Sequence, residues 1–190
     1  MGTNRDPYTW RGQKTTSDGQ SLVQSESLTE ARYHAGKGEV FILSSGFATT
    51  PAAADDFTNI LYLKNDSTTD DINLGYLRTC SEVAGKWQWV EAPTALGATA
   101  ITAINMNRGS RKTLTATIQS YSAAGVTFTD GTRTDYPQWI QGGPAHSLQP
   151  FEGSFIIGPG DSFGLEFAPF SATAGEACIS LQLWQSAPET

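Results

Sequence analysis

The stretch from Gly160 to Gly164 reads GDSFG and matches G-x-S-x-G, a pattern that can mark a nucleophilic serine. In the hydrolases that use this pattern, the serine stands on a sharp turn between a strand and a helix, and an acid and a histidine follow it in the chain. The two histidines here, His34 and His146, both precede Ser162. The spacing argues against this form of hydrolase, although a triad with another chain order stays open.

The residues after Ser162 have the period of a strand. Phe163, Leu165 and Phe167 alternate with small or polar neighbours, and no helical pattern follows. Proline presets its own backbone angle and glycine accepts positive φ, so a tight turn is expected over residues 159–161. We therefore expect Ser162 to be a turn residue and the protein not to be an enzyme.

Metal sites, which need a fixed spacing of their ligands, also find little support in the sequence. Asp66, Asp70 and Asp71 could gather around calcium, but the EF-hand spacing and its terminal glutamate are missing, so a solvated turn is favoured. Cys80 and Cys178 lie far apart without a CxxC spacing, and they form no zinc site. We expect two free buried thiols and no cofactor, while a disulfide stays open.

The charge of the chain limits its partners. Acidic residues outnumber basic residues by 19 to 12, which gives a formal net charge of -7 at pH 7. Binding to phosphate needs a concentrated positive surface, so the composition argues against nucleic acid as the main partner. Arg108, Arg111 and Lys112 form a basic cluster in a short connection between two strand-like runs, where a solvated turn is expected.

Two tryptophans suggest a binding alternative. Trp87 and Trp89 in GKWQWVE share one face of an expected strand. Exposed aromatic rings on a sheet can stack on sugar rings, whereas aromatic residues also fill cores and subunit interfaces. We favour the core or an interface and keep a carbohydrate-binding or receptor-binding module as the alternative. Together with Trp184, these rings are expected to supply apolar surface for self-association.

The composition favours one all-β domain. A chain of 190 residues is long enough for one well-buried core, and only 16% of its residues are charged. In TLTATIQ, the side chains of Leu114, Ala116 and Ile118 share one face. Short strand patterns joined by turn formers indicate a β-sandwich. The patterns are GEVFILSSGF, NILYLKN, INLGYLRT, GKWQWVE, AITAINMN, TLTATIQ, GVTFTD, a stretch around Gln138 to Gln141, GSFII, SFGLEF and EACISLQLW.

Residues 1–36 are polar, rich in glycine and weakly patterned, so we expect an extended arm, with a short helix over Leu22 to Tyr33 as the alternative. Tyr8 and Trp10 suggest anchors for a neighbouring surface, although they could equally fold back on their own domain. The first residues lack the apolar core of a secretory signal, and no segment reaches the roughly eighteen apolar residues of a membrane span. We expect neither ordinary export nor membrane insertion.

Three runs of the chain carry a resemblance to a known family. They are GATAITAINMNRGSRKTLTATIQ, FEGSFIIGPGDSFGLEF and GEACISLQLW. Together they resemble jelly-roll virion proteins of tailed bacteriophages, over roughly residues 38 to 185. The matching positions are Asn105, Asn107 and Arg108 before one strand, and Pro159, Gly160, Asp161 and Ser162 before a late strand. These motifs mark the turns before strands and imply no catalytic role.

The resemblance implies an antiparallel jelly-roll β-sandwich over residues 37–190, preceded by the N-terminal arm of residues 1–36. It implies a capsid decoration or cement protein of the virion, assembled in the host cytoplasm and bound to the major capsid protein, with a homotrimer as the expected oligomer. A tail, collar or fibre-adaptor component is the alternative within viruses. The residues expected to bind partners are Tyr8, Trp10, Trp87 and Trp89.

Overall fold

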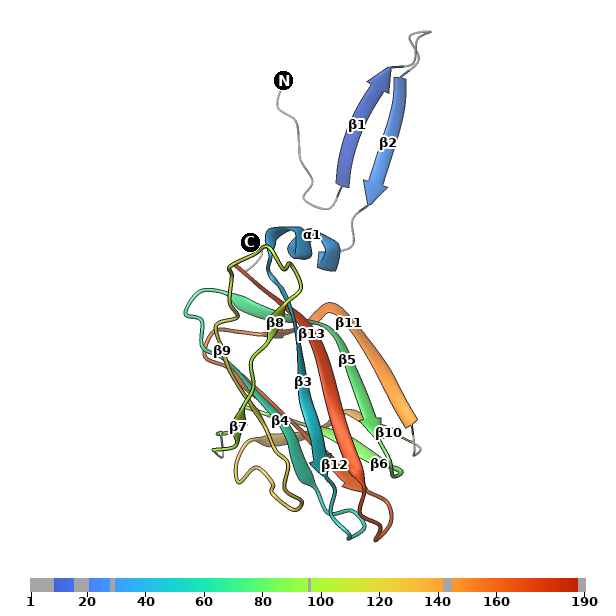
Figure 1. The fold of residues 1–190 in the computed structure, drawn as a ribbon, viewed down its shortest axis with the longest axis vertical. Helices are drawn as coiled ribbons and strands as arrows, with labels where there is room; N and C mark the ends of the chain where they lie inside the picture. Colours follow the sequence, from blue (N-terminus) through green and yellow to red (C-terminus); the bar gives the residue numbers. More distant parts are fainter. Residues whose placement is uncertain (1–8, 16–20, 28–29, 96, 142–144, 188–190) are drawn as a thin grey trace.

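A computed structural model of the chain describes residues 9–15, 21–27, 30–95, 97–141 and 145–187, shown as a ribbon in Figure 1. Its N-terminal part consists of the hairpin strands β1 (Thr9–Thr15) and β2 (Ser21–Ser27) and the helix α1 (Glu30–Lys37). The remaining elements are the strands β3 (Val40–Thr49), β4 (Thr58–Asn65), β5 (Asp71–Ser81), β6 (Gly85–Glu91), β7 (Thr99–Ala100), β8 (Ile104–Asn105), β9 (Ala116–Ser120), β10 (Thr132–Gln141), β11 (Ala145–Ile157), β12 (Ser162–Pro169) and β13 (Glu176–Ser186).

The strands after α1 form two antiparallel sheets, so the all-β expectation is confirmed. The six-stranded sheet has the order β10-β6-β12-β4-β9-β7, and the five-stranded sheet has the order β11-β5-β13-β3-β8. Early strands pair with late ones: β3 with β13, β4 with β12, β5 with β11 and β6 with β10. The chain therefore folds as one long antiparallel hairpin divided between two layers.

One hydrophobic core lies between the two sheets. Alternating residues of each strand point into it, as the period of two in the sequence predicts. In β13, Ile179, Leu181 and Leu183 are fully buried, and Ile118 of β9 joins them from the other sheet. Leu114 and Ala116 pack against this cluster, which confirms the expected face of TLTATIQ.

The outer face of the six-stranded sheet is covered by the protein's own chain, over residues 121–131, which we call the cover segment. Phe128 and Tyr121 of this segment pack with Tyr62 and Val90 in a second buried cluster. The stretch GVTFTD was expected to be a strand, and that expectation is wrong. Its apolar residues alternate because Val126 and Phe128 face this sheet, although no ladder of strand hydrogen bonds forms there.

A buried ion pair fixes the cover segment to the sheet. Glu166 of β12 is fully buried, and its carboxylate accepts hydrogen bonds from Nε and Nη2 of Arg133, both at 2.9 Å. The backbone N–H of Phe128 donates to the same carboxylate at 3.2 Å and to Oδ1 of Asn59 at 3.1 Å. A side chain at Gly164 would collide with the Phe128 ring, so glycine is required beneath it. These polar bonds thus hold the Phe128 ring against the sheet.

The expectation of two free thiols is wrong, because Cys80 and Cys178 form a disulfide. The two cysteines are directly opposite each other in β5 and β13, with their Cα atoms 5.2 Å apart. Nothing in the sequence spacing indicates this pairing, because it depends on which distant strands become neighbours.

Two further expectations differ from the structure. The run AITAINMN forms only the short strands β7 and β8, which add to different sheets. The segment expected as an extended arm contains the β1–β2 hairpin, in which Trp10 is opposite Glu26, followed by α1. The alternative helix over Leu22 to Tyr33 is also wrong, since its first half is β2 and the helix begins at Glu30.

Replacement of Arg133 tests the ion pair. Arg133→Met should leave the buried Glu166 carboxylate without its cation. Since 36% of the Arg133 side chain remains exposed, we expect a loss of about 2 kcal/mol in the free energy of unfolding, below the value for a fully buried pair. Urea denaturation measures it, with the exposed Arg108→Met as the control expected to stay within about 0.5 kcal/mol. Equal stability of the two variants would show that the pair does not hold the cover segment.

Candidate functional site

The junction between α1 and the sheets is the best-defined polar site of the described residues. We call it the arm root and define it by His34 of α1, Glu39, Asn105, Asn107, Lys112 and Trp184. In Figure 1 the β1–β2 hairpin extends away from the sandwich on the far side of α1. The arm root therefore holds the helix that follows the hairpin in the chain.

His34 is the centre of this junction. Its ring is buried and stacks on the indole of Trp184, with 5.6 Å between the ring centroids and 15° between the planes. Nδ1 of His34 lies 2.7 Å from Oε2 of Glu39. One side chain thus joins α1 to the end of β13 by stacking and to the start of β3 by a polar contact.

Glu39 connects the helix to the loop before β9. Its Oε1 accepts a hydrogen bond from Nζ of Lys112 at 2.8 Å. Burial raises the pKa of Glu39, but the hydrogen bonds from Lys112 and His34 and the positive charges of Lys112 and Lys37 outweigh burial, so its pKa lies below the ordinary value. The carboxylate is therefore ionised at neutral pH and holds two elements at once.

Two asparagines hold the end of α1. The last carbonyls of a helix lack partners within it and need outside donors. Nδ2 of Asn107 donates to the carbonyls of Ala35 and Gly36 at 3.3 and 3.5 Å, and Nδ2 of Asn105 donates to the carbonyl of Gly38 at 2.8 Å. Gly38 has a φ of 72°, the left-handed conformation in which helices often end.

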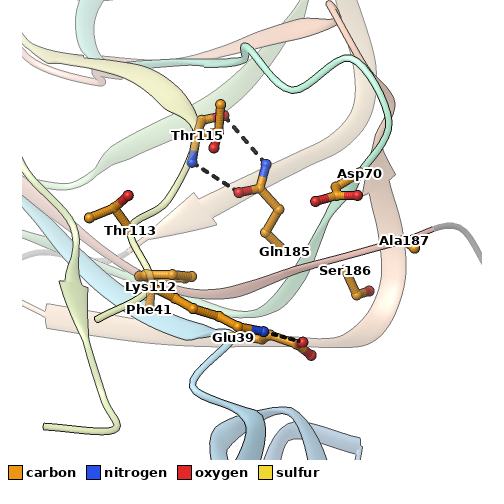
Figure 2. Close-up of a pocket in the computed structure, with 9 residues that line it drawn as sticks. All are labelled: Glu39, Phe41, Asp70, Lys112, Thr113, Thr115, Gln185, Ser186 and Ala187. Carbon is orange, nitrogen blue, oxygen red and sulfur yellow. Dashed lines mark hydrogen bonds and ion pairs between the residues drawn. The ribbon is translucent and has the colours of Figure 1, made fainter. Parts of the chain in front are cut away.

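A pocket of about 370 Å³ opens beside the arm root (Figure 2). It is lined by Glu39, Phe41, Asp70, Lys112, Thr113, Thr115, Gln185, Ser186 and Ala187. Oε1 of Gln185 accepts the backbone N–H of Thr115 at 2.9 Å, and Nε2 of Gln185 donates to Oδ1 of Asn65 at 3.3 Å. Glu39 and Lys112 bind each other across one wall. These polar groups are used to hold β13, β4 and the loop before β9 together.

The pocket does not assemble a nucleophile with a base. Among its lining residues, all of which the structure describes, no Ser or Thr hydroxyl is hydrogen-bonded to a histidine or a carboxylate. The acid and the amine that face each other, Glu39 and Lys112, neutralise each other. The arrangement positions chain segments and offers no catalytic dyad.

Ser162 lies where the turn interpretation places it. Pro159 and Gly160 form a turn, Gly160 has a φ of 82°, and Ser162 is the first residue of β12. The Ser162 hydroxyl donates to the carbonyl of Pro93 at 2.8 Å. His34 is engaged at the arm root, and the side chain of His146 lies outside the described residues. Ser162 therefore joins a turn to a neighbouring loop.

The aromatic residues expected at a partner surface are placed differently. Trp87 and Trp89 are 0% and 2% exposed and belong to the core between the sheets. The favoured core interpretation of these rings is therefore confirmed, and their assignment as partner-binding or sugar-stacking residues is wrong, since neither ring reaches the surface. Trp184, also expected to supply apolar surface for a trimer, is buried under α1. Tyr8 and the side chain of Trp10 lie outside the described residues.

The charged clusters of the sequence are also accounted for. Asp66 accepts a hydrogen bond from the Thr117 hydroxyl at 2.6 Å, and Asp70 lies at the pocket. The described residues contain no group of three or more His, Cys, Asp or Glu side chains placed to hold a metal. In the basic cluster, Lys112 pairs with Glu39, while Arg108 and Arg111 are exposed. No helix within the described ranges is long and apolar enough to cross a membrane.

Sequence reasoning missed His34, Glu39 and Lys112 as a connected group. No local pattern links these residues, and only the fold brings α1, β3 and the loop before β9 together. Asn105 and Asn107 were noted as a motif, but their role in holding α1 depends on the position of the helix. Comparisons with protein-family models, curated proteins and solved structures give no match for this chain.

Replacement of Ser162 tests whether this residue has a structural role or is a nucleophile. Ser162→Ala removes one hydrogen bond to the Pro93 carbonyl, and we expect a loss of about 1 kcal/mol in the free energy of unfolding. Hydrolysis of aryl esters should be at background for both proteins. An esterase activity that disappears with Ser162→Ala would contradict the structural role.

Replacement of Glu39 tests the arm root through pH. Because the folded pKa lies below the ordinary value of 4.5, Glu39 stabilises the fold fully above that pH, and this stabilisation is lost as the pH falls through the folded pKa. Glu39→Gln should therefore cost about 1 kcal/mol at pH 7 and progressively less as the pH falls below the ordinary value of 4.5. Thermal unfolding across pH measures this, with the exposed Glu91→Gln as the control. A pH-independent loss would show that the carboxylate charge is not what matters.

Proposed function

We propose that this protein is a structural component of a bacteriophage virion, built as a jelly roll and attached to the head surface as a decoration or cement protein. The pairing order supports the jelly roll. Strands β3, β13, β5 and β11 make most of one sheet, strands β4, β12, β6 and β10 make most of the other, and first strands pair with last. Eight antiparallel strands wound in two sheets are the pattern of jelly rolls, which occur in viral capsid proteins and in lectin domains.

The motif residues behind the resemblance gain structural roles that are consistent with this proposal. Asn105 and Asn107 hold the end of α1, and residues 159–162 form the turn that starts β12. Both motifs therefore serve the shape of the domain and the placement of its arm. This is the role expected of residues in a protein that works by its surface and its assembly.

The observation that best supports the proposal is the β1–β2 hairpin, which precedes a helix held by the arm root. A two-stranded hairpin is at best marginally stable by itself in water, because it has no second layer to pack against. The β1–β2 hairpin extends beyond α1 in Figure 1, and the arm root holds α1 through the His34–Trp184 stack, the His34–Glu39 contact and the bonds from Asn107. Such an arm gains stability when it lies on a neighbouring protein, for which we propose the major capsid protein.

The proposed mechanism is additive contact. Each copy contributes a modest contact through its arm, and several copies on one assembly act at high effective concentration. Bridges of this kind hold neighbouring capsid subunits together without chemistry. The proposed location is therefore the virion, after assembly in the host cytoplasm.

Copy number tests the proposal. Particles from lysates that contain this chain are purified on density gradients, and its copies per particle are counted by quantitative mass spectrometry. Hundreds of copies support head decoration, whereas about a dozen or fewer indicate a tail, collar or fibre-adaptor position, as the lower symmetry of tails requires. Absence from the particles would contradict a virion role.

Deletion of the hairpin should weaken attachment and leave the domain folded. We expect a chain without residues 2–27 to keep its strand-rich circular dichroism spectrum and to bind depleted particles about tenfold more weakly, or about 1.4 kcal/mol. The double variant Tyr8→Ala with Trp10→Ala should reproduce much of that loss, because buried aromatic residues best offset the cost of ordering an arm. Thr9→Ala with Thr15→Ala is the matched control. Normal binding by the truncated chain would contradict the role of the arm.

A further inference from the structure

The outer face of the five-stranded sheet is unusually apolar. We call it the open face; it extends from the row of Phe47 and Cys178 to the row of Ile156 and Asn73. Ala177, Ile179 and Leu181 of β13 point into the core, so the intervening Cys178, Ser180 and Gln182 point outward. Leu148, Arg78 and Ser180 form one outward row across β11, β5 and β13.

Exposed apolar side chains concentrate on this face. Among the side chains that the structure describes, six large apolar ones are exposed, by 43% to 66%. Five of the six lie on the open face. These five are Phe47, Ile104, Met106, Leu148 and Ile156, of which Met106 contacts the outward Gln182 and Ile104 is opposite Ile42. Single exposed apolar residues are ordinary, but a contiguous group marks a contact surface.

The six-stranded sheet differs, because the protein's own chain covers its outer face. The outer face of the six-stranded sheet is buried under the cover segment, with Phe128 held by Glu166 and Asn59. On the open face, α1 covers one end, where His34 stacks on Trp184 of β13 and the helix also lies close to β3 and β11. In Figure 1 the open face is turned toward the viewer, with α1 across its upper end.

The charges around the open face indicate its occupant. Of its described side chains between the Phe47 and Ile156 rows, only Arg78 carries a charge, although the whole chain has a net charge of -7. Among these described side chains, two copies that meet here bring no carboxylates together. The two ends differ in charge: Glu82 and Glu176 lie beyond the disulfide, whereas at the Trp184 end α1 carries the exposed Arg32 and Lys37 and β5 carries the half-buried Asp71, which leaves this end net positive among these side chains.

We propose that the open face binds the open face of a second copy of this chain, in an antiparallel pair related by a two-fold axis. The axis lies in the plane of the face and across the strands, so the acidic end of each copy meets the α1 end of the other. Packed sheets lie about 10 Å apart with their outward side chains interdigitated. A two-fold contact of one face with itself closes at two copies.

The size of the face fits the centre of such a contact. The width of the face across the strands is four spacings of about 4.8 Å. Its length along the strands is three steps of two residues, each about 6.8 Å, so its area is about 400 Å². A standard interface buries about 800 Å² per partner, with an apolar centre and a polar rim. The open face supplies the centre, and the charged ends supply the rim. The inference stands on this face alone and holds whether or not the protein belongs to a virion.

Solution mass tests the pair. Sedimentation velocity of the full chain from about 1 to about 200 µM should show a monomer converting to a dimer as concentration rises. Phe47→Glu with Leu148→Glu places like charges in the contact and should raise the dimer dissociation constant about tenfold or more, with an unchanged circular dichroism spectrum. Phe170→Glu changes the sixth exposed apolar residue, which lies off the face, and should leave the constant unchanged.

Charge reversal tests the antiparallel arrangement. Lys37→Glu and Glu176→Lys should each weaken the dimer, and the two together should restore it, because the pair is re-formed with its charges exchanged. A monomer at every concentration, the homotrimer expected from the resemblance, or a dimer that Phe47→Glu with Leu148→Glu leaves intact would overturn the proposal. Failure of the double reversal to restore the dimer would also overturn it. None of these outcomes depends on particles, so they remain distinct from the test of the virion role.

Discussion

Each sheet of a two-layer domain has two faces, and the core between the layers can cover only one face of each. The rest of this structure depends on what covers each of the two outer faces. On the six-stranded sheet, the cover segment brings Phe128 onto Tyr62 and Val90, and the buried Glu166 with Arg133 holds it there. The five-stranded sheet has only α1 at one end of its outer face, and Phe47, Leu148 and Ile156 stay exposed. This difference separates a face that stabilises the monomer from a face suited to a partner.

The arm root connects that open face to the arm. Trp184 lies at one end of the face, and His34 stacks on it while Glu39 joins the helix to Lys112. The helix thus borders the open face on one side and leads to the hairpin on the other. In the proposed antiparallel pair, the two arms would leave from opposite ends, so that one pair could reach two neighbouring surfaces. The pairing of copies and the reach of the arms would then support the same bridging role.

The sequence predicted the parts of the fold that depend on local periodicity. The alternation in β9 and β13 identified the core side chains, and glycine and proline identified the turn before Ser162. The alternation in β6 placed Trp87 and Trp89 on one face, but it could not distinguish the core from an interface, so these residues were also kept as partner-binding candidates. The alternating residues of GVTFTD resembled a strand because they bury one side, although their backbone is not in a ladder. The Cys80–Cys178 bond and the His34–Glu39–Lys112 group depend on strand order, which no local pattern contains.

Side-chain footprinting tests most directly whether the open face is a contact surface. The full chain is labelled with a photogenerated carbene at about 1 and about 200 µM, and the modified residues are quantified by mass spectrometry, since association grows with concentration. The account predicts that labelling of Phe47, Leu148 and Ile156 falls at the higher concentration, while labelling of Phe170 stays constant. Equal labelling of the open face at both concentrations would contradict it.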